Sequence, residues 1–138
     1  KTISDEAFSY IYDRFDGVTW YIQYILNMLY TAISTDSILT TDDAKAAIAG
    51  ILAQHRFAYQ ALVYQLTSKQ KQVLTAIAAE NGPTSIMSQA FLRKYGLGAS
   101  TVQGAVKVLL DRDFISQDDG AYRLCDKFLE MYLQEELQ

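Results

Sequence analysis

The sequence of 138 residues contains one cysteine, one histidine and no long apolar run. A single cysteine cannot form an internal disulfide, and one cysteine with one histidine cannot supply the several ligands of a zinc site. No apolar run approaches the roughly 20 residues that span a bilayer, and residues 1–6 lack the basic and apolar regions of a signal peptide. We therefore expect a cytoplasmic protein without a metal site and without a membrane partner.

Positive charge is also scarce, since the formal net charge at pH 7 is −4. Residues 1–66 carry four Lys plus Arg against seven Asp plus Glu, which gives −3, and residues 67–138 carry eight against nine, which gives −1. Nucleic-acid affinity depends on Lys and Arg that neutralise phosphates, so the mean charge argues against a general polyanion binder. A nearly neutral second half is still compatible with one basic face.

Hydrophobic residues, in contrast, make up 50% of the chain and recur at helical spacing. Ser4 predicts a helix start, because its side-chain oxygen can cap free amides, and Asp16-Gly17 predicts the end of that helix. A second helix is expected over residues 19–33. A third runs from Thr40 or Thr41 to about Leu66, either continuous or broken near His55. We interpret the tyrosines of this half as packing area with their hydroxyls at the wet rim: Tyr10, Tyr12, Tyr21, Tyr24, Tyr30, Tyr59 and Tyr64.

The pattern starts afresh at Leu66-Thr67-Ser68, where Thr67 or Ser68 is expected to cap a new helix. The apolar residues of that helix share one face: Val73, Leu74, Ile77 and Ala78. A second helix is expected from about Ser85 to Tyr95, followed by a turn at residues 96–98 and a third helix capped by Ser100 or its neighbour. The third helix is expected to point Val102, Val106, Leu109 and Leu110 inward.

After the third helix, residues 114–117 and 121–124 predict two short strands around an Asp-Gly hairpin turn. A closing helix follows from Asp126, with Phe128, Leu129, Tyr132 and Leu133 on one face. Three helices with a tight turn between the last two, followed by a hairpin, are typical of a winged helix-turn-helix. The sequence therefore predicts a mainly α protein with a helical bundle in residues 1–66, a winged-helix domain in residues 67–138, and one small β-hairpin as the wing.

The segments "LTSKQKQVLTAIA", "SQAFLRKYGLGASTVQGAVKVLLDRDFI" and "GAYRLCDKFLEMYL" resemble the C-terminal winged helix of prokaryotic archaeal-type, AAA-related P-loop ATPases. By the same resemblance the first half is similar to the helical lid of these enzymes. In that family a Gly-x-Pro element opens a lid helix near the bound nucleotide. The segment "DGVTWYIQYI" places Gly17 and Tyr21 at the corresponding positions and has Thr19 where the family has proline. An ordinary helix–helix corner is the alternative interpretation of this segment.

The resemblance implies an ATPase parent that binds ATP and magnesium, with the ATPase core as one partner of this region. No Gly-x-x-x-x-Gly-Lys-Ser/Thr loop occurs in the sequence, so nothing here can cradle the phosphates. The chain also has no initiator Met, and we expect a fragment that is not itself an enzyme. In this interpretation the fragment is a regulatory and interaction module that couples nucleotide state to a protein partner or to duplex DNA.

The third helix of the winged domain, over residues 99–112, offers the candidate face for DNA or for a partner. Its exposed side is expected to present Ser100, Thr101, Gln103, Gly104, Lys107 and Asp111. Further cations that could form a positive rim around this face are Lys69, Lys71, Arg93, Lys94 and Arg123. Small polar groups and amides near a helix N-terminus suit major-groove reading. Asp118-Asp119 at the wing tip opposes it, because carboxylates repel phosphate. Both DNA reading and protein contact therefore remain open at this point.

No set of residues predicts a catalytic site. The only histidine and the only cysteine, His55 and Cys125, have no motif that would orient them as a pair. The acid pair Asp42-Asp43 complements the dipole of a helix start, and Asp118-Asp119 fits turn chemistry.

Overall fold

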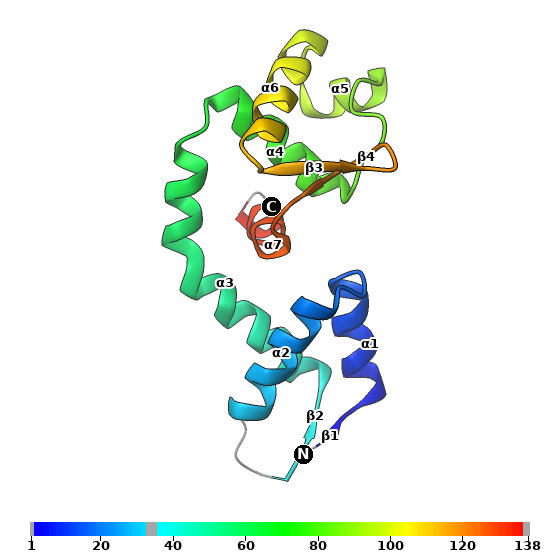
Figure 1. The fold of residues 1–138 in the computed structure, drawn as a ribbon, viewed down its shortest axis with the longest axis vertical. Helices are drawn as coiled ribbons and strands as arrows, with labels where there is room; N and C mark the ends of the chain where they lie inside the picture. The colour runs from blue at the N-terminus through cyan, green and yellow to red at the C-terminus, as the bar shows by residue number, and fades with distance from the viewer. Residues whose placement is uncertain (1, 33–35, 137–138) are drawn as a thin grey trace. The chain divides into compact units, whose positions relative to one another are not determined.

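The computed structural model describes residues 2–32 and 36–136 (Figure 1). The chain divides into two compact units between His55 and Arg56, within one continuous helix. Each unit has its own core and is described separately below. The second unit therefore includes the end of that helix, whereas the boundary predicted from the sequence lies between residues 66 and 67.

The first unit contains two short strands, two complete helices and the beginning of a third helix. Its elements are β1 (Thr2–Ile3), α1 (Asp5–Arg14), α2 (Thr19–Ala32), β2 (Ile38–Leu39) and the first part of α3 (Thr41–Tyr64). The predicted end of the second helix at residue 33 falls outside the described residues. α3 continues through His55 without the break that we had considered.

Helix α1 begins as predicted, because the Ser4 hydroxyl oxygen accepts a hydrogen bond from the Ala7 amide at 3.1 Å. The amphipathic spacing also places the core as expected. Side chains of α1, of the turn after it, of α2 and of β2 are fully buried: Ile11, Phe15, Ile25 and Leu39. Burial of these large apolar groups is what holds this small unit together.

A parallel pairing of β1 with β2 was not predicted. Thr2 lies opposite Ile38 and Ile3 opposite Leu39, and the Ser4 amide donates to the Leu39 carbonyl oxygen at 3.0 Å. Two-residue strands give no alternating pattern that a sequence reading could detect. The pairing ties the segment before α1 to the segment before α3.

The second unit is built around one central helix. Its elements after the end of α3 are α4 (Ser68–Glu80), α5 (Gln89–Tyr95), α6 (Ala99–Asp111), β3 (Ile115–Asp118), β4 (Ala121–Leu124) and α7 (Lys127–Glu136). α4 contacts α6, α7 and β4, and Figure 1 shows α4, α5 and α6 grouped with the hairpin beside them. The four residues predicted to point inward from α4 are all buried: Val73, Leu74, Ile77 and Ala78.

The end of α3 packs with the second unit through its tyrosine and aliphatic residues. The ring of Tyr59 lies 5.5 Å from the ring of Tyr132 in α7, and its hydroxyl donates to Asp126 at 3.3 Å. Val63 and Leu66 are buried as well. These contacts explain why the compact unit begins at Arg56 rather than at Thr67.

Two predicted helix starts in this unit were wrong. α5 begins at Gln89 rather than near Ser85, because the Ser88 hydroxyl oxygen accepts from the Phe91 amide at 3.1 Å and ends a preceding turn. α6 begins at Ala99 after Gly98, which has no side chain to cap the helix, so Ser100 lies inside the first turn. On the inner face of α6 the fourth buried residue is Ala105, and Leu110 is only half-buried.

The predicted hairpin forms, with β3 antiparallel to β4 and Asp118 opposite Ala121. Asp119 and Gly120 make its two-residue turn with φ angles of 51° and 78°. Both angles lie in the left-handed region that a type I′ turn requires, which is why an Asp-Gly pair occupies it. The Tyr122 amide also donates to the Pro83 carbonyl oxygen at 2.9 Å, so β4 is fixed to the loop between α4 and α5.

The predicted fold class is confirmed as mainly α, with one small antiparallel hairpin after a helix-turn-helix. The parallel β1–β2 pair is an addition to it. Among the described residues, every helix is too short or too polar to cross a bilayer.

Candidate functional site

The outward face of α6 carries most of the predicted candidate residues. Because Val102, Val106 and Leu109 are buried against the unit, Ser100, Gln103 and Lys107 project from the opposite side and are exposed. Thr101 is half-buried at the edge of that face. The structure therefore brings together three of the predicted side chains, of which only Lys107 is charged.

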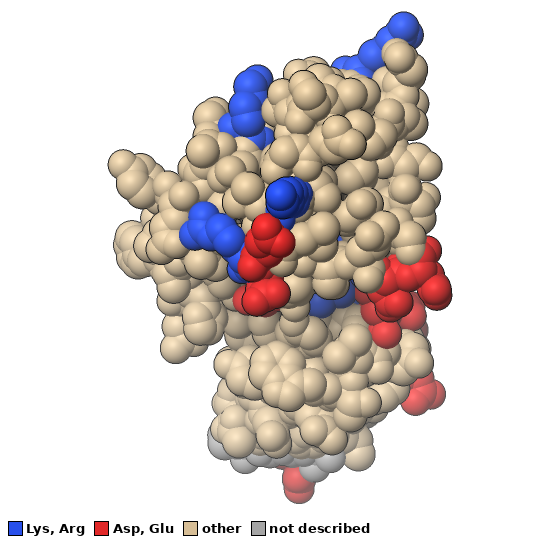
Figure 2. Space-filling model, turned by 45° about the horizontal axis from the view of Figure 1, so that its top comes forward, with Lys and Arg blue, Asp and Glu red and all other residues tan. Residues whose placement is uncertain are grey.

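The other predicted cations come from different elements, and two of them already have partners. Lys94 in α5 lies 3.0 Å from a carboxylate oxygen of Glu80 in α4. The guanidinium of Arg123 in β4 lies against Gly82, where an added Cβ would be 2.8 Å from its Cζ. Arg93 is exposed on α5. On the face turned toward the viewer in Figure 2, Lys and Arg occur in separate places, some with Asp or Glu beside them, rather than as one continuous patch.

The Glu80 carboxylate is the centre of a small polar cluster. The Tyr95 hydroxyl donates to its Oε1 at 2.8 Å, and the Lys94 ammonium binds the same oxygen. These two hydrogen bonds, the one from Tyr95 being the larger cause, hold the pKa of Glu80 below its ordinary value. The bond to Glu80 raises the pKa of Lys94, while burial raises the pKa of Tyr95. The cluster joins α4 to α5 and neutralises one of the predicted cations.

Removing the tyrosine hydroxyl should make a small, pH-dependent difference. We expect Tyr95→Phe to lower the free energy of unfolding by about 1 kcal/mol at pH 7, because the variant loses one partly exposed hydrogen bond to a carboxylate. Since the pKa of Glu80 is lowered by folding, this stabilisation is present above the unfolded pKa near 4.5 and is lost as pH falls through the folded value. Urea unfolding of both proteins from pH 7 to pH 3 measures it. A difference that persists at the lowest pH would contradict this account, and Tyr122→Phe is the control.

The wing tip is acidic and exposed. Asp118 ends β3 opposite Ala121, Asp119 occupies the turn, and both side chains are exposed. A wing that follows a DNA backbone would present Lys or Arg at this point. The tip is therefore suited to contact a neutral or basic surface.

The comparisons with known proteins identify this second unit. A family model described as "Probable winged helix domain" matches residues 57–135, which is more than half of the chain. The chain belongs to this winged-helix family. No curated protein and no solved structure matches the chain. The family match covers the winged helix and part of α3, and it carries no ATPase assignment.

The start of the match agrees with the second compact unit rather than with the predicted domain boundary. Phe57, where the match begins, is next to Arg56, where the unit begins. The winged helix of this protein therefore includes the last two turns of α3 as a helix that precedes α4.

The predicted lid element forms the corner between α1 and α2 in the first unit. Gly17 has φ +69° and lies under the Tyr12 ring, where a Cβ would be 2.8 Å from ring atoms. Thr19 begins α2 and is exposed. Tyr21 is half-buried and stacks on Phe15 with ring centroids 5.2 Å apart. Gly17 and Tyr21 thus pack within the corner. Of the three residues of the predicted lid element, only Thr19 is exposed.

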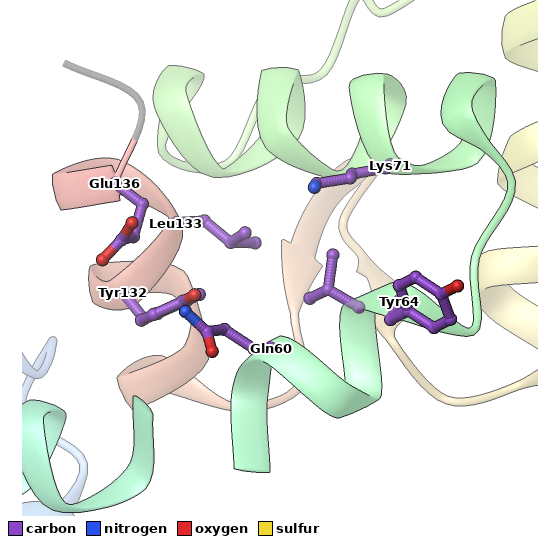
Figure 3. A pocket seen from close by; sticks show the side chains of 7 residues that line it. Gln60, Tyr64, Lys71, Tyr132, Leu133 and Glu136 are labelled. Carbon is purple, nitrogen blue, oxygen red and sulfur yellow. The ribbon is translucent and has the colours of Figure 1, made fainter. Parts of the chain in front are cut away.

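A groove of about 350 Å³ in the winged helix was missed at the level of sequence (Figure 3). α3 contributes Gln60 and Tyr64 to it, α4 contributes Lys71, and α7 contributes Tyr132 and Glu136. Tyr64 had been interpreted as packing area, but it is 89% exposed. The signal that could have located it is its position on the helical wheel of α3, away from the buried Tyr59 and Val63.

Cys125 and the acidic residues give no sign of catalysis or metal binding. Cys125 is exposed directly after β4, and partial burial of its thiol, together with the nearby Asp113 charge, raises the pKa of the thiol, which disfavours the nucleophilic thiolate. Over residues 2–32 and 36–136, no three His, Cys, Asp or Glu side chains gather closely enough to hold a metal ion.

Proposed function

We propose that the winged helix is a protein-contact module of an ATP-binding P-loop ATPase, and that it couples nucleotide state to a protein partner. The observation that carries the protein-contact part is the charge of the surface that a DNA-reading winged helix would use. Lys107 is the one cation on the exposed face of α6, and Asp118 and Asp119 form the wing tip. Such a surface offers few phosphate contacts and two repulsive groups.

The surrounding cations support the same proposal, because several are already used within the fold. Lys94 is bound to Glu80. Arg112 at the end of α6 donates to the Gln65 side chain at 3.0 Å and lies over the Phe114 ring. Moving these side chains to phosphates would break existing contacts, so their positive charge contributes less to DNA affinity than a count of residues suggests.

The ATPase part of the proposal is supported by the resemblance of residues 66–133 to the winged helix of archaeal-type ATPases and of residues 17–21 to their lid element. In this proposal ATP and magnesium bind to the parent's core, the chain itself has no ATPase activity, and the protein is cytoplasmic. Equilibrium binding of ATP to the full-length protein tests this part. A full-length protein that binds no ATP would remove the ATPase assignment and leave the protein-contact module.

The protein-contact part is tested by titrating a fluorescein-labelled random duplex with this chain at about 50 and 200 mM salt and following anisotropy. We expect binding weaker than the range of roughly 1–100 µM that is typical of non-specific DNA binders, at both salt concentrations. We also expect Lys107→Glu to leave the titration unchanged.

The alternative function, major-groove reading by residues 99–112, predicts the opposite result. Micromolar binding that weakens steeply between the two salt concentrations, and that Lys107→Glu abolishes, would assign the winged helix to DNA. Lys45→Glu is the matched control, because Lys45 is also an exposed lysine but lies in the first unit.

A further inference from the structure

The groove of the winged helix has a fixed apolar floor. Val63 from α3 and Leu133 from α7 line it and are nearly fully buried, so their positions are set by the core. Figure 3 shows Leu133 pointing from α7 into the space between the helices. A groove whose floor is part of the core exists before any partner arrives, which lowers the cost of binding.

One edge of the groove presents exposed aromatic surface. Tyr64 is 89% exposed on α3, and Phe57, two turns earlier on the same outward side, is 81% exposed. The ten residues from Phe57 to Leu66 include no charged residue. Exposed aromatic side chains beside a preformed groove are the groups that most often dominate protein–protein binding energy. Phe57 and Tyr64 are seven residues apart, so together they extend the apolar surface along α3 by about 10 Å, at 1.5 Å per residue.

The charges at the groove are unequal. Glu136 on α7 is paired with Arg56 at 3.8 Å. Lys71 on α4 makes no ion pair within the part of the chain that the structure describes, and Figure 3 shows it extending over the groove toward α7. The groove therefore presents one uncompensated positive charge above an apolar floor, and a carboxylate is the complement of that charge.

From this geometry we propose that the groove between α3, α4 and α7 binds an amphipathic helix of a partner protein, with an acidic residue of that helix paired to Lys71. This inference rests on the proposed protein-contact function and names its surface and the chemistry of its partner. Apolar residues at i, i+3 or i+4 and i+7 of the partner helix pack mainly on the exposed rings of Tyr64 and Phe57, and one of them reaches the small exposed edge of the floor at Val63 and Leu133. The acidic residue lies at the edge of that apolar stripe.

Charge also favours a different protein over a second copy of this chain. A symmetric dimer through this groove would place the groove surface of one copy against the same surface of the other. Within the described residues, that surface carries no uncompensated carboxylate, because its Glu136 is paired with Arg56, so a second copy would leave Lys71 without a partner of opposite charge. An acidic helix from another protein supplies that partner.

The test uses two synthetic helices of about three turns, labelled with fluorescein, with leucines along one face and either Glu or Lys at the edge of that face. We expect the whole chain to bind the Glu peptide at least fivefold more tightly than the Lys peptide. Lys71→Glu should weaken binding of the Glu peptide about tenfold and strengthen binding of the Lys peptide, which reports a direct charge contact. Tyr64→Ala should weaken both peptides about fivefold.

The control is Lys69→Glu, which makes the same charge change on the exposed side of α4 outside the groove. Three results would overturn the inference: no binding of either peptide at about 1 mM, an equal effect of the two lysine substitutions, or a dimer in sedimentation that Tyr64→Ala dissociates. The last would assign the groove to a second copy. None of the three changes the duplex titration above, so failure of the groove is distinguishable from failure of the protein-contact function.

Discussion

Replacing Leu109 by alanine is expected to lower the free energy of unfolding of the winged helix by about 2–5 kcal/mol. Leu109 is fully buried on the inner face of α6, and α6 packs on α4 at the centre of the unit. The substitution removes apolar contacts and leaves a cavity that the neighbouring helices can fill only in part. Urea unfolding, followed by the negative circular dichroism signal that α-helices give at 222 nm, measures the change in the free energy of unfolding.

The matched control lies on the same helix two residues earlier. Lys107 is exposed, so Lys107→Ala should change the free energy of unfolding by no more than about 0.5 kcal/mol. A loss below about 1 kcal/mol for Leu109→Ala would mean that α6 is not packed on α4 as the structure shows. The pair of variants therefore tests the inner face of α6 separately from its helix propensity.

Local signals explain why so much of the fold could be predicted. Ser4 caps α1 as expected, and Thr67 caps α4 in a reciprocal arrangement with the side chain of Gln70. The Asp119-Gly120 turn needs two residues with positive φ, and few residue pairs satisfy that need. In each case a few neighbouring residues contain the whole physical reason for the structure.

The failures have the opposite character, because they depend on contacts between distant residues or on competing local signals. The β1–β2 pairing joins Ile3 to Leu39 through backbone groups that leave no trace in side-chain type. The start of α5 was expected near Ser85, and the structure begins the helix after Ser88, whose side chain caps it. Both positions are serines, so residue type alone does not decide between them.

The candidate site shows the same division. Helical periodicity located the exposed side of α6 correctly, with Ser100, Gln103 and Lys107 outward. It could not show that Lys94 is bound by Glu80, because that contact joins two helices. It also could not locate the groove, whose walls come from three helices and whose cation, Lys71, was expected in the positive rim of the DNA face.

Charge pairing and exposed aromatic surface distinguish the groove of the winged helix from the surface that was expected to read DNA. The surface expected to read DNA has lost part of its positive charge to contacts within the fold, as in the Lys94–Glu80 pair. The groove, in contrast, retains an unpaired Lys71 and the exposed Tyr64 ring. The proposed protein contact needs apolar surface and a charge that a partner can complement, and in this unit the two occur together in the groove.

Phe15→Ala should produce the second large effect, a loss of about 3–5 kcal/mol in the first unit. Phe15 is fully buried and stacks on Tyr21. Trp20, the one tryptophan of the chain, lies 4.7 Å from Tyr21 by ring centroids. The Trp20 side chain is 62% exposed, and unfolding separates its ring from Tyr21, so its fluorescence reports the unfolding of this unit through the loss of that contact. We expect Phe15→Ala to move that transition to lower urea.

Leu109→Ala is expected to have a different effect on the Trp20 fluorescence transition. Because Leu109 belongs to the other compact unit, it should leave the midpoint of the Trp20 transition unchanged while it moves the transition seen by circular dichroism. Equal shifts of the Trp20 midpoint in both variants would mean that the two units unfold as one cooperative body.

A shift of the Trp20 midpoint in Phe15→Ala alone would instead show that the unit containing residues 17–21 and the winged helix are thermodynamically independent. Under the proposed function, coupling of nucleotide state between the two units would then have to be supplied by a bound partner or by the proposed ATPase core, because two independently stable units do not sense each other.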